Sequence, residues 1–167
     1  LSALGTGSLN GTVLLFRTPE EAAEVAGGDS CRFTIPVEIP ENSTPEEAIL
    51  YIYTTRPGDT RTASAPDLRF SLDGQNLEAG RQYSDGMKSD TTPAANTFCI
   101  DANSRIKESG DYTLDIQNKG EACTVYGGVL VLVCSNPEMP ETSYWISEGC
   151  DVVLADLLGG ASEEDAV

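Results

Sequence analysis

Histidine is absent from this sequence of 167 residues. Its absence removes the side chain that most often serves as a general base at neutral pH, and also the commonest ligand of transition metals. Hydrolase mechanisms that depend on histidine are therefore excluded. The sequence also lacks an apolar run of about 18 residues, the length that a transmembrane helix needs. Because 40% of the residues are nevertheless hydrophobic, we expect a soluble domain with a packed core rather than a disordered chain.

Positive charge is scarce as well. The sequence has 10 Lys and Arg residues against 27 Asp and Glu residues, which gives a formal net charge of -17 at pH 7. Phosphate backbones and anionic lipid surfaces would repel such a chain, so neither nucleic acid nor membrane insertion is expected. An excess of carboxylates suits a salty or cation-rich exterior, where counterions screen the repulsion and Ca²⁺ can bridge neighbouring subunits. No other cofactor is expected.

The cysteines form no C-x-x-C pair and have no histidine to complete a zinc or redox motif. We therefore expect an oxidising compartment, with two internal disulfides and one spare thiol. The spare thiol is either a buried small hydrophobic group or the site of a disulfide to another chain. The sequence does not fix the pairing. The disulfide candidates are Cys31, Cys99, Cys123, Cys134 and Cys150.

Alternation of apolar and polar residues predicts several β-strands. From Cys31 to Ile39 every second residue is apolar, which indicates a strand with one buried face, and Pro36 favours an edge position. Segments 48–54 and 122–134 are apolar on both faces, as expected of central strands, and Gly127 with Gly128 suggests a bulge. Weaker strands are predicted at GTVLLF (from Gly11), LRFSL (from Leu68), NTFCI (from Asn96) and DYTLDIQN (from Asp111), separated by turns such as Asp73-Gly74.

The motif Thr-Pro-Glu-Glu-Ala occurs at 18–22 and again at 44–48. Each copy has the features of a helix start: a capping threonine, a proline at the first helical position, and acids near the positive end of the helix dipole. We predict one short helix near 18–25. The second copy leads directly into an apolar strand, so there we expect one helical turn at most.

The two ends of the chain suggest processing and a tail. The sequence starts at Leu1 rather than at Met, so we expect a processed mature form or an excised fragment of a longer protein. Residues 1–153 are predicted to form the β-sandwich domain. Residues 154–167 are predicted to be an acidic C-terminal tail or a linker.

Three segments together resemble a known but uncharacterised family. GTVLLF, AILYIYTT and the block from Val125 to Val153 resemble a β-sandwich domain of secreted surface proteins of methanogenic archaea. That family has an early glycine-led strand, a strand of the form A-x-L-Y, a strand of the form Y-G-x-x-L-x-V-V, and then Y-W-I-x-E-G. The matching residues are Ala48, Leu50, Tyr51, Tyr126, Gly127, Leu130, Val133, Tyr144, Trp145, Ile146, Glu148 and Gly149. The cysteines and the Thr-Pro-Glu-Glu motifs are not part of the pattern.

The resemblance implies a secreted archaeal surface protein and supplies no catalytic residues. Methanogens build disulfide-hardened sheaths and surface layers, and this composition fits a subunit of one. Because one fold can serve many functions, the resemblance favours a structural role without proving it.

Few residues stand out as candidates for chemistry. Glu148 beside Trp145 could bind a sugar or tune a pKa in a glycosidase, or it could be a turn residue that accepts backbone hydrogen bonds. The segments 73–76 and 85–90 carry oxygen ligands beside glycines and are either calcium loops or ordinary turns. Asn10 and Asn42 begin N-x-[ST] triplets and are candidate glycosylation sites.

Taken together, the sequence predicts an antiparallel β-sandwich, jelly-roll or immunoglobulin-like, with about eight strands and one short helix. The expected function is that of a structural extracellular or cell-envelope subunit, not an enzyme. It would self-associate into a surface layer, sheath or filament through β-edge contacts, with segment 1–16 or the segment after Asp151 as a donated strand, and through an intermolecular disulfide. An adhesin or carbohydrate-binding module is the alternative. It requires exposed aromatics on one face, the candidates being Tyr51, Tyr53, Tyr83, Tyr144 and Trp145.

Overall fold

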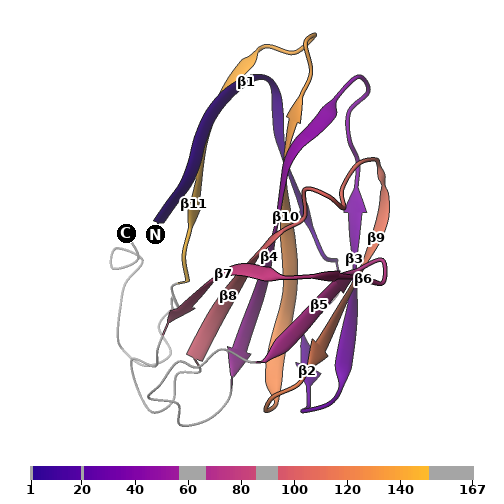
Figure 1. Cartoon of the computed structure of the whole chain (residues 1–167), viewed down its shortest axis with the longest axis vertical. Coiled ribbons are helices and arrows are strands. Elements are labelled where there is room, and N and C mark those ends of the chain that lie inside the picture. Colours follow the sequence, from indigo (N-terminus) through magenta and orange to yellow (C-terminus); the bar gives the residue numbers. More distant parts are fainter. Residues whose placement is uncertain (1, 20, 57–66, 86–93, 151–167) are drawn as a thin grey trace.

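Two antiparallel sheets form the β-sandwich shown in Figure 1. The computed structural model describes residues 2–19, 21–56, 67–85 and 94–150, and this part of the chain contains eleven strands and no helix. The predicted all-β class and sandwich architecture are therefore confirmed. The predicted tail at 154–167 and the boundary at 153 lie outside the described residues.

The larger sheet has seven strands in the order β11-β1-β10-β4-β8-β7, with β2 beside β10. Its strands are β1 (Ser2–Arg17), β2 (Ala23–Val25), β4 (Thr44–Arg56), β7 (Ala79–Asp85), β8 (Ala94–Asp101), β10 (Cys123–Ser135) and β11 (Glu141–Glu148). The smaller sheet has the order β3-β9-β5-β6. Its strands are β3 (Ser30–Val37), β5 (Leu68–Leu72), β6 (Gln75–Leu77) and β9 (Gly110–Asn118).

The main core fills the space between the two sheets. Leu50 and Ile100 of the larger sheet and Phe33 and Leu114 of the smaller one are at most 1% exposed. Across the sandwich, the rings of Phe70 and Phe98 lie 5.2 Å apart between their centroids at an interplanar angle of 58°, a favourable tilted aromatic contact. The alternation along each strand turns these residues toward one another, as the sequence predicts.

β1 changes its partner at Gly11. Residues Ser2–Asn10 pair with β11, whereas Gly11–Arg17 pair with β10. The backbone passes so close to Cys134 at this point that a β-carbon on Gly11 would meet the Cys134 carbonyl oxygen. The first half of β1 and all of β11 thus make a two-stranded ribbon, Ser2–Asn10 with Glu141–Glu148, which Figure 1 shows leaving the sandwich where β1 arches over.

The ribbon packs against the outer face of the larger sheet, the face turned away from the smaller sheet. Ile49, Tyr51, Cys99 and Val133 of that face form a second buried cluster with Ile146 of the ribbon. Further side chains pack against this cluster, namely Leu9, Val13, Tyr83, Val131 and Tyr144. The larger sheet is therefore buried on both faces where the ribbon covers it, which explains why segments 48–54 and 122–134 are apolar throughout.

Other strand predictions are confirmed. β4 and β10 are central strands, and β3, which carries Pro36, is an edge strand of the smaller sheet. Asp73 and Gly74 have φ values of 48° and 75° and form the turn between β5 and β6, as a two-residue hairpin loop requires. Gly127 has a φ of 100°, and the pairing of β10 with β4 shifts register between Val125 and Gly127, so the bulge is also confirmed.

The predicted helix near 18–25 is wrong. The Thr18 amide donates to the Gly128 carbonyl oxygen (3.0 Å), and the Thr18 hydroxyl accepts from the Gly128 amide (3.1 Å). Thr18 therefore caps the bulge of β10 instead of a helix, and Ala23–Val25 pair with β10 as β2. The second copy of the motif is likewise not a helical turn, because β4 already begins at Thr44. In both places sheet pairing outweighs a local preference for helix.

Replacement of Gly127 by alanine tests the bulge. Its positive φ disfavours any side chain, and a β-carbon there would meet the Thr18 hydroxyl. We expect Gly127→Ala to lower the free energy of unfolding by about 2–3 kcal/mol. Gly110→Ala is the matched control, since a β-carbon at Gly110 has open space, and it should change stability by less than about 0.5 kcal/mol. Urea denaturation measures both, and equal losses would contradict the role of the bulge.

Candidate functional site

Glu148, at the end of β11, is a buried carboxylate whose side chain is 1% exposed. Its Oε1 accepts hydrogen bonds from the Tyr51 hydroxyl (2.8 Å) and from Nη2 of Arg81 (2.8 Å). Its Oε2 accepts from Nε of Arg81 (2.7 Å) and from the Tyr83 hydroxyl (3.0 Å). Four donors thus occupy the roughly four acceptor positions of the carboxylate. The donors come from β4 and β7, so this network fastens the end of the ribbon to the larger sheet.

The network keeps Glu148 charged. The hydrogen bond from Arg81 is the main cause that lowers the pKa of Glu148 below its usual value; burial opposes it, and the hydrogen bonds from the two tyrosines assist it. The pKa of Arg81 is raised, chiefly by its hydrogen bond to Glu148. Burial, followed by the hydrogen bond to Glu148, raises the pKa of the Tyr51 hydroxyl. All of these groups therefore keep their usual charge at neutral pH.

This geometry is that of a structural ion pair. A general acid in a glycosidase needs a raised pKa and a proton free to reach the substrate, whereas Glu148 has a lowered pKa and fully occupied oxygens. Glu148 accepts hydrogen bonds from side chains, not from the backbone amides expected of a turn residue. Arg81 supplies two of the four hydrogen bonds to Glu148. Nothing in the sequence indicated this role beyond the spacing of Arg81 and Tyr83, which are two residues apart and so lie on the same face of β7.

An apolar groove of about 360 Å³ lies beside this network, between β11 and the outer face of the larger sheet. It is lined by Val13, Leu15, Tyr51, Tyr53, Thr97, Val129, Val131 and the segment from Trp145 to Gly149. Within it, Trp145 is 74% exposed, Leu15 69% and Tyr53 40%. A smaller hollow shares Tyr53, Thr97 and Gly149 with the groove and adds Tyr126 and Cys150. The ribbon thus leaves part of the outer face uncovered.

The aromatic residues expected of a binding module divide into two groups. Tyr51, Tyr83 and Tyr144 belong to the cluster beneath the ribbon or pack against it. Tyr53 and Trp145 are exposed and border the apolar groove. The structure therefore brings two of the five to an accessible surface and uses the other three for packing.

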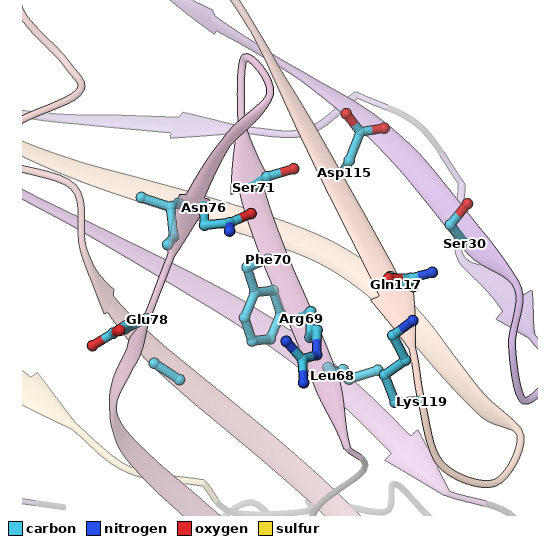
Figure 2. Close-up of a pocket in the computed structure, with 12 residues that line it drawn as sticks. Ser30, Leu68, Arg69, Phe70, Ser71, Asn76, Glu78, Asp115, Gln117 and Lys119 are labelled. Atoms are coloured by element: carbon cyan, nitrogen blue, oxygen red, sulfur yellow. The ribbon is translucent and has the colours of Figure 1, made fainter.

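Another hollow lies on the smaller sheet and has both polar and apolar walls (Figure 2). It has a volume of about 1030 Å³, and Figure 2 shows Arg69 and Ser71 of β5 on one side and Asp115, Gln117 and Lys119 on the other. The Asp115 carboxylate accepts from Nε of Arg32 at 2.7 Å. Charged, amide and hydroxyl side chains of this kind are typical of a solvated sheet face.

The candidate calcium loops are placed only in part. Asp73 lies in the β5–β6 turn, and its Oδ1 accepts from the Thr113 amide at 2.8 Å, a hydrogen bond that joins this turn to β9. Residues 86–90 of the second loop lie outside the described part. Within the described ranges, no three Asp, Glu, Cys or His side chains gather in a way that could hold a metal ion. No helix in those ranges is long and apolar enough to cross a membrane.

Both candidate glycosylation sites lie at the surface. Nδ2 of Asn10 donates to the Met139 carbonyl oxygen at 3.0 Å. Nδ2 of Asn42 donates to Oε2 of Glu138 at 3.3 Å, and Asn42 has a positive φ of 59°. A glycan on either nitrogen would have to replace one of these contacts, so glycosylation remains a prediction for both.

The five cysteines are thiols in this structure and occupy different environments. Cys123 belongs to the main core, as does Cys134 near the other end of β10, and Cys31 packs against this core. Cys99 belongs to the cluster beneath the ribbon, and Cys150 borders the smaller hollow. Burial followed by the charge of Glu148 raises the pKa of Cys99 to about 12, so it is protonated at neutral pH.

The chain matches one known family over most of its length. The model of a family described as "protein of unknown function (DUF3344)" matches residues 5–167. The chain belongs to this family. No curated protein matches the chain. The match covers most of the ribbon, both sheets and the residues around the apolar groove, so these features lie within the family domain.

Replacement of Glu148 by glutamine tests the ion pair. Glutamine leaves Arg81 without its charge partner and offers one acceptor oxygen where four donors meet. We expect a loss of about 2–3 kcal/mol in the free energy of unfolding at pH 7, below the full value for a buried pair because Arg81 is 45% exposed. The control is Asp115→Asn, which breaks the surface pair with the exposed Arg32 and should cost much less, because solvent screens such pairs.

The stabilisation that Glu148 provides should depend on pH. The pKa of Glu148 is lower in the folded state than its ordinary 4.5, so its stabilisation is present above pH 4.5 and is lost as the pH falls through the folded value. The stability difference between wild type and Glu148→Gln should therefore shrink as the pH falls from about 6 to 3. Urea titrations at several pH values measure it, and a difference independent of pH would show that Glu148 is not charged in the folded protein.

Proposed function

We propose that this protein is a structural subunit of an extracellular or cell-envelope assembly, and that it self-associates through the apolar groove with a second copy of the chain. The observation that carries the proposal is the uncovered part of the outer face. Leu15 of β1 and Trp145 of β11 are exposed by 69% and 74% beside the groove, whereas Ile49, Tyr51 and Val133 of the outer face are buried. Contiguous apolar surface of this kind marks interaction sites in soluble proteins.

The chain's own ribbon supports a second copy as the occupant. On the covered part of the outer face, Leu9, Tyr144 and Ile146 of the ribbon pack against apolar side chains of the sheet. The groove continues the same face along the same strands, with Leu15 two residues beyond Val13 and Tyr53 two beyond Tyr51. A strand with alternating apolar residues would cover this surface as the ribbon covers its neighbour.

The strand edges support the mode of contact. β11 and β7 are the outermost strands in the order of the larger sheet, and the groove runs beside β11. A strand from another copy would gain main-chain hydrogen bonds along such an edge and side-chain contacts in the groove. Of the proposed donor segment 1–16, residues 2–16 are already paired within their own chain as part of β1. The other proposed donor, the segment after Asp151, lies outside the described residues and follows directly on Cys150 at the adjoining hollow.

Charge and composition support an extracellular location. A formal charge of -17 opposes association of two copies at low ionic strength, and salt or divalent cations such as Ca²⁺ would relieve this repulsion. The resemblance to secreted surface proteins of methanogenic archaea points to the same location, as a surface layer or a sheath. The proposal assigns no catalytic activity to the chain.

A second candidate function rests on Trp145 and Tyr53. Both aromatic side chains are exposed beside the groove, and exposed aromatics next to polar groups favour the binding of sugar rings. The protein would then be an adhesin or a carbohydrate-binding module on the archaeal cell surface. The two functions make different demands on the same surface, so one set of variants separates them.

Sedimentation at several salt concentrations, with reductant present, tests non-covalent self-association. Wild type should form oligomers increasingly as NaCl rises toward about 1 M, where the Debye length is about 3 Å. Leu15→Glu should raise the apparent dissociation constant at least about tenfold, because it places a charge in the contact. Gln117→Glu adds the same charge on the smaller sheet and should behave as wild type.

A monomer at every salt concentration would contradict the proposed self-association through the groove. Calorimetric titration with oligosaccharides, with Trp145→Ala as the variant, then tests the binding module. Loss of sugar binding in that variant would make it the better description.

A further inference from the structure

Cys31 and Cys123 lie on opposite sheets at one end of the sandwich. Cys31 is the second residue of β3 in the smaller sheet, and Cys123 is the first residue of β10 in the larger sheet. Cys123 is 2% exposed within the main core, and Cys31 packs against that core. We propose that these two cysteines form a disulfide that links the two sheets.

The local connections bring the two strands together. Cys123 is paired directly with Val25 of β2, and a short turn, in which the Asp29 amide donates to the Ala26 carbonyl oxygen at 3.1 Å, leads from β2 to β3. The chain therefore crosses from one sheet to the other within the few residues that separate Val25 from Cys31. The crossing therefore places the beginnings of β3 and β10, where Cys31 and Cys123 lie, at the same end of the sandwich.

Asn118 of β9 provides a second connection at this end. Its Nδ2 lies 3.8 Å from Sγ of Cys123 and donates to the Val25 carbonyl oxygen at 3.0 Å. Cys31 is paired with Ile116, two residues before Asn118 on the same strand. The two cysteines thus lie near Asn118, one on each sheet. The electrostatics agree, since burial and then the nearby Cys123 raise the pKa of Cys31 to about 11.

The other three cysteines are poorly placed to pair with either of these. Cys134 lies on the inner side of β10, but eleven residues beyond Cys123, which is about 36 Å along a strand. Cys99 lies in the cluster on the outer face, and Cys150 borders the hollow on that face. A disulfide requires Cα atoms about 4.4–6.8 Å apart, and the larger sheet stands between these two residues and the main core.

The reaction is a thiol–disulfide exchange. Oxidised glutathione is the oxidant. One protein thiolate attacks the disulfide of glutathione, forms a mixed disulfide and releases one reduced glutathione. The second protein thiolate then attacks the mixed disulfide, forms the Cys31–Cys123 bond and releases a second reduced glutathione. The two protein thiols are thereby oxidised by two electrons, which the glutathione disulfide accepts. Cys123 is buried and Cys31 is partly buried, and burial raises the pKa of both thiols. Because few thiolates are then present in the folded state, the bond should form most readily during folding.

This inference rests on the extracellular location in the proposed function, since a cytosolic protein would remain reduced. The test therefore uses the purified chain of 167 residues, refolded in a defined glutathione buffer. After alkylation without reduction, we expect three alkylated cysteines and one linked pair of peptides that contains Cys31 and Cys123. Digestion with trypsin and chymotrypsin assigns the pair, because Tyr126 lies between Cys123 and Cys134.

Thermal melting of oxidised and reduced samples provides the second measurement. The disulfide would close a loop of roughly 90 residues, so the melting temperature of oxidised wild type should exceed that of the reduced form by about 5–15 °C. Cys31→Ala and Cys123→Ala should each abolish this difference. Cys134→Ala, a matched buried control, should retain it. Comparing two redox states of one variant cancels any direct cost of the substitution.

The outcomes are distinct. A peptide map with Cys31 and Cys123 unlinked, or linked to other cysteines, overturns the inference, as does a melting difference that survives Cys31→Ala. If the pair forms in glutathione buffer but native material from the source cells contains both thiols reduced, the proposed extracellular location fails and the pairing stands. Self-association in reductant is independent of both results.

Discussion

Burial of the larger sheet on both of its faces is the constraint on which the rest of this structure depends. β4 and β10 carry apolar side chains at successive positions, so one face packs against the smaller sheet and the other needs a second cover. The chain provides this cover by bending β1 at Gly11 and returning as a ribbon with β11. Leaving so much apolar surface in water would cost about 25 cal/mol for each Å².

The ribbon in turn requires the ion pair. A two-stranded ribbon is marginally stable by itself, and its last residue, Glu148, is held by donors from β4 and β7. Burial of a carboxylate is tolerated because all of its acceptor positions are filled and the charge of Arg81 is opposite. The network therefore fixes where the ribbon lies, and the position of the ribbon decides which part of the outer face stays open.

The proposed assembly and the proposed disulfide follow from different parts of this arrangement. The apolar groove lies between β11 and the outer face, on the side of the larger sheet that faces away from the main core. The Cys31–Cys123 pair lies between the sheets, where β2 leads into β3. One property concerns contacts between copies, and the other concerns the closure of a single sandwich.

The sequence by itself determined the all-β class, the central strands, the edge position of Pro36, the Asp73-Gly74 turn and the bulge at Gly127, because periodicity and turn chemistry are local properties. Local signals failed at Thr18, because a hydroxyl that can cap a helix can equally accept a hydrogen bond from the bulge of β10. They also failed at β2, β6, β7 and β11, because these strands are short or polar. Only the tertiary structure decided that Glu148 is buried while Trp145 is exposed. Alternation along β11 defines its two faces, but which face turns inward depends on Tyr51, Arg81 and Tyr83, which come from distant parts of the chain.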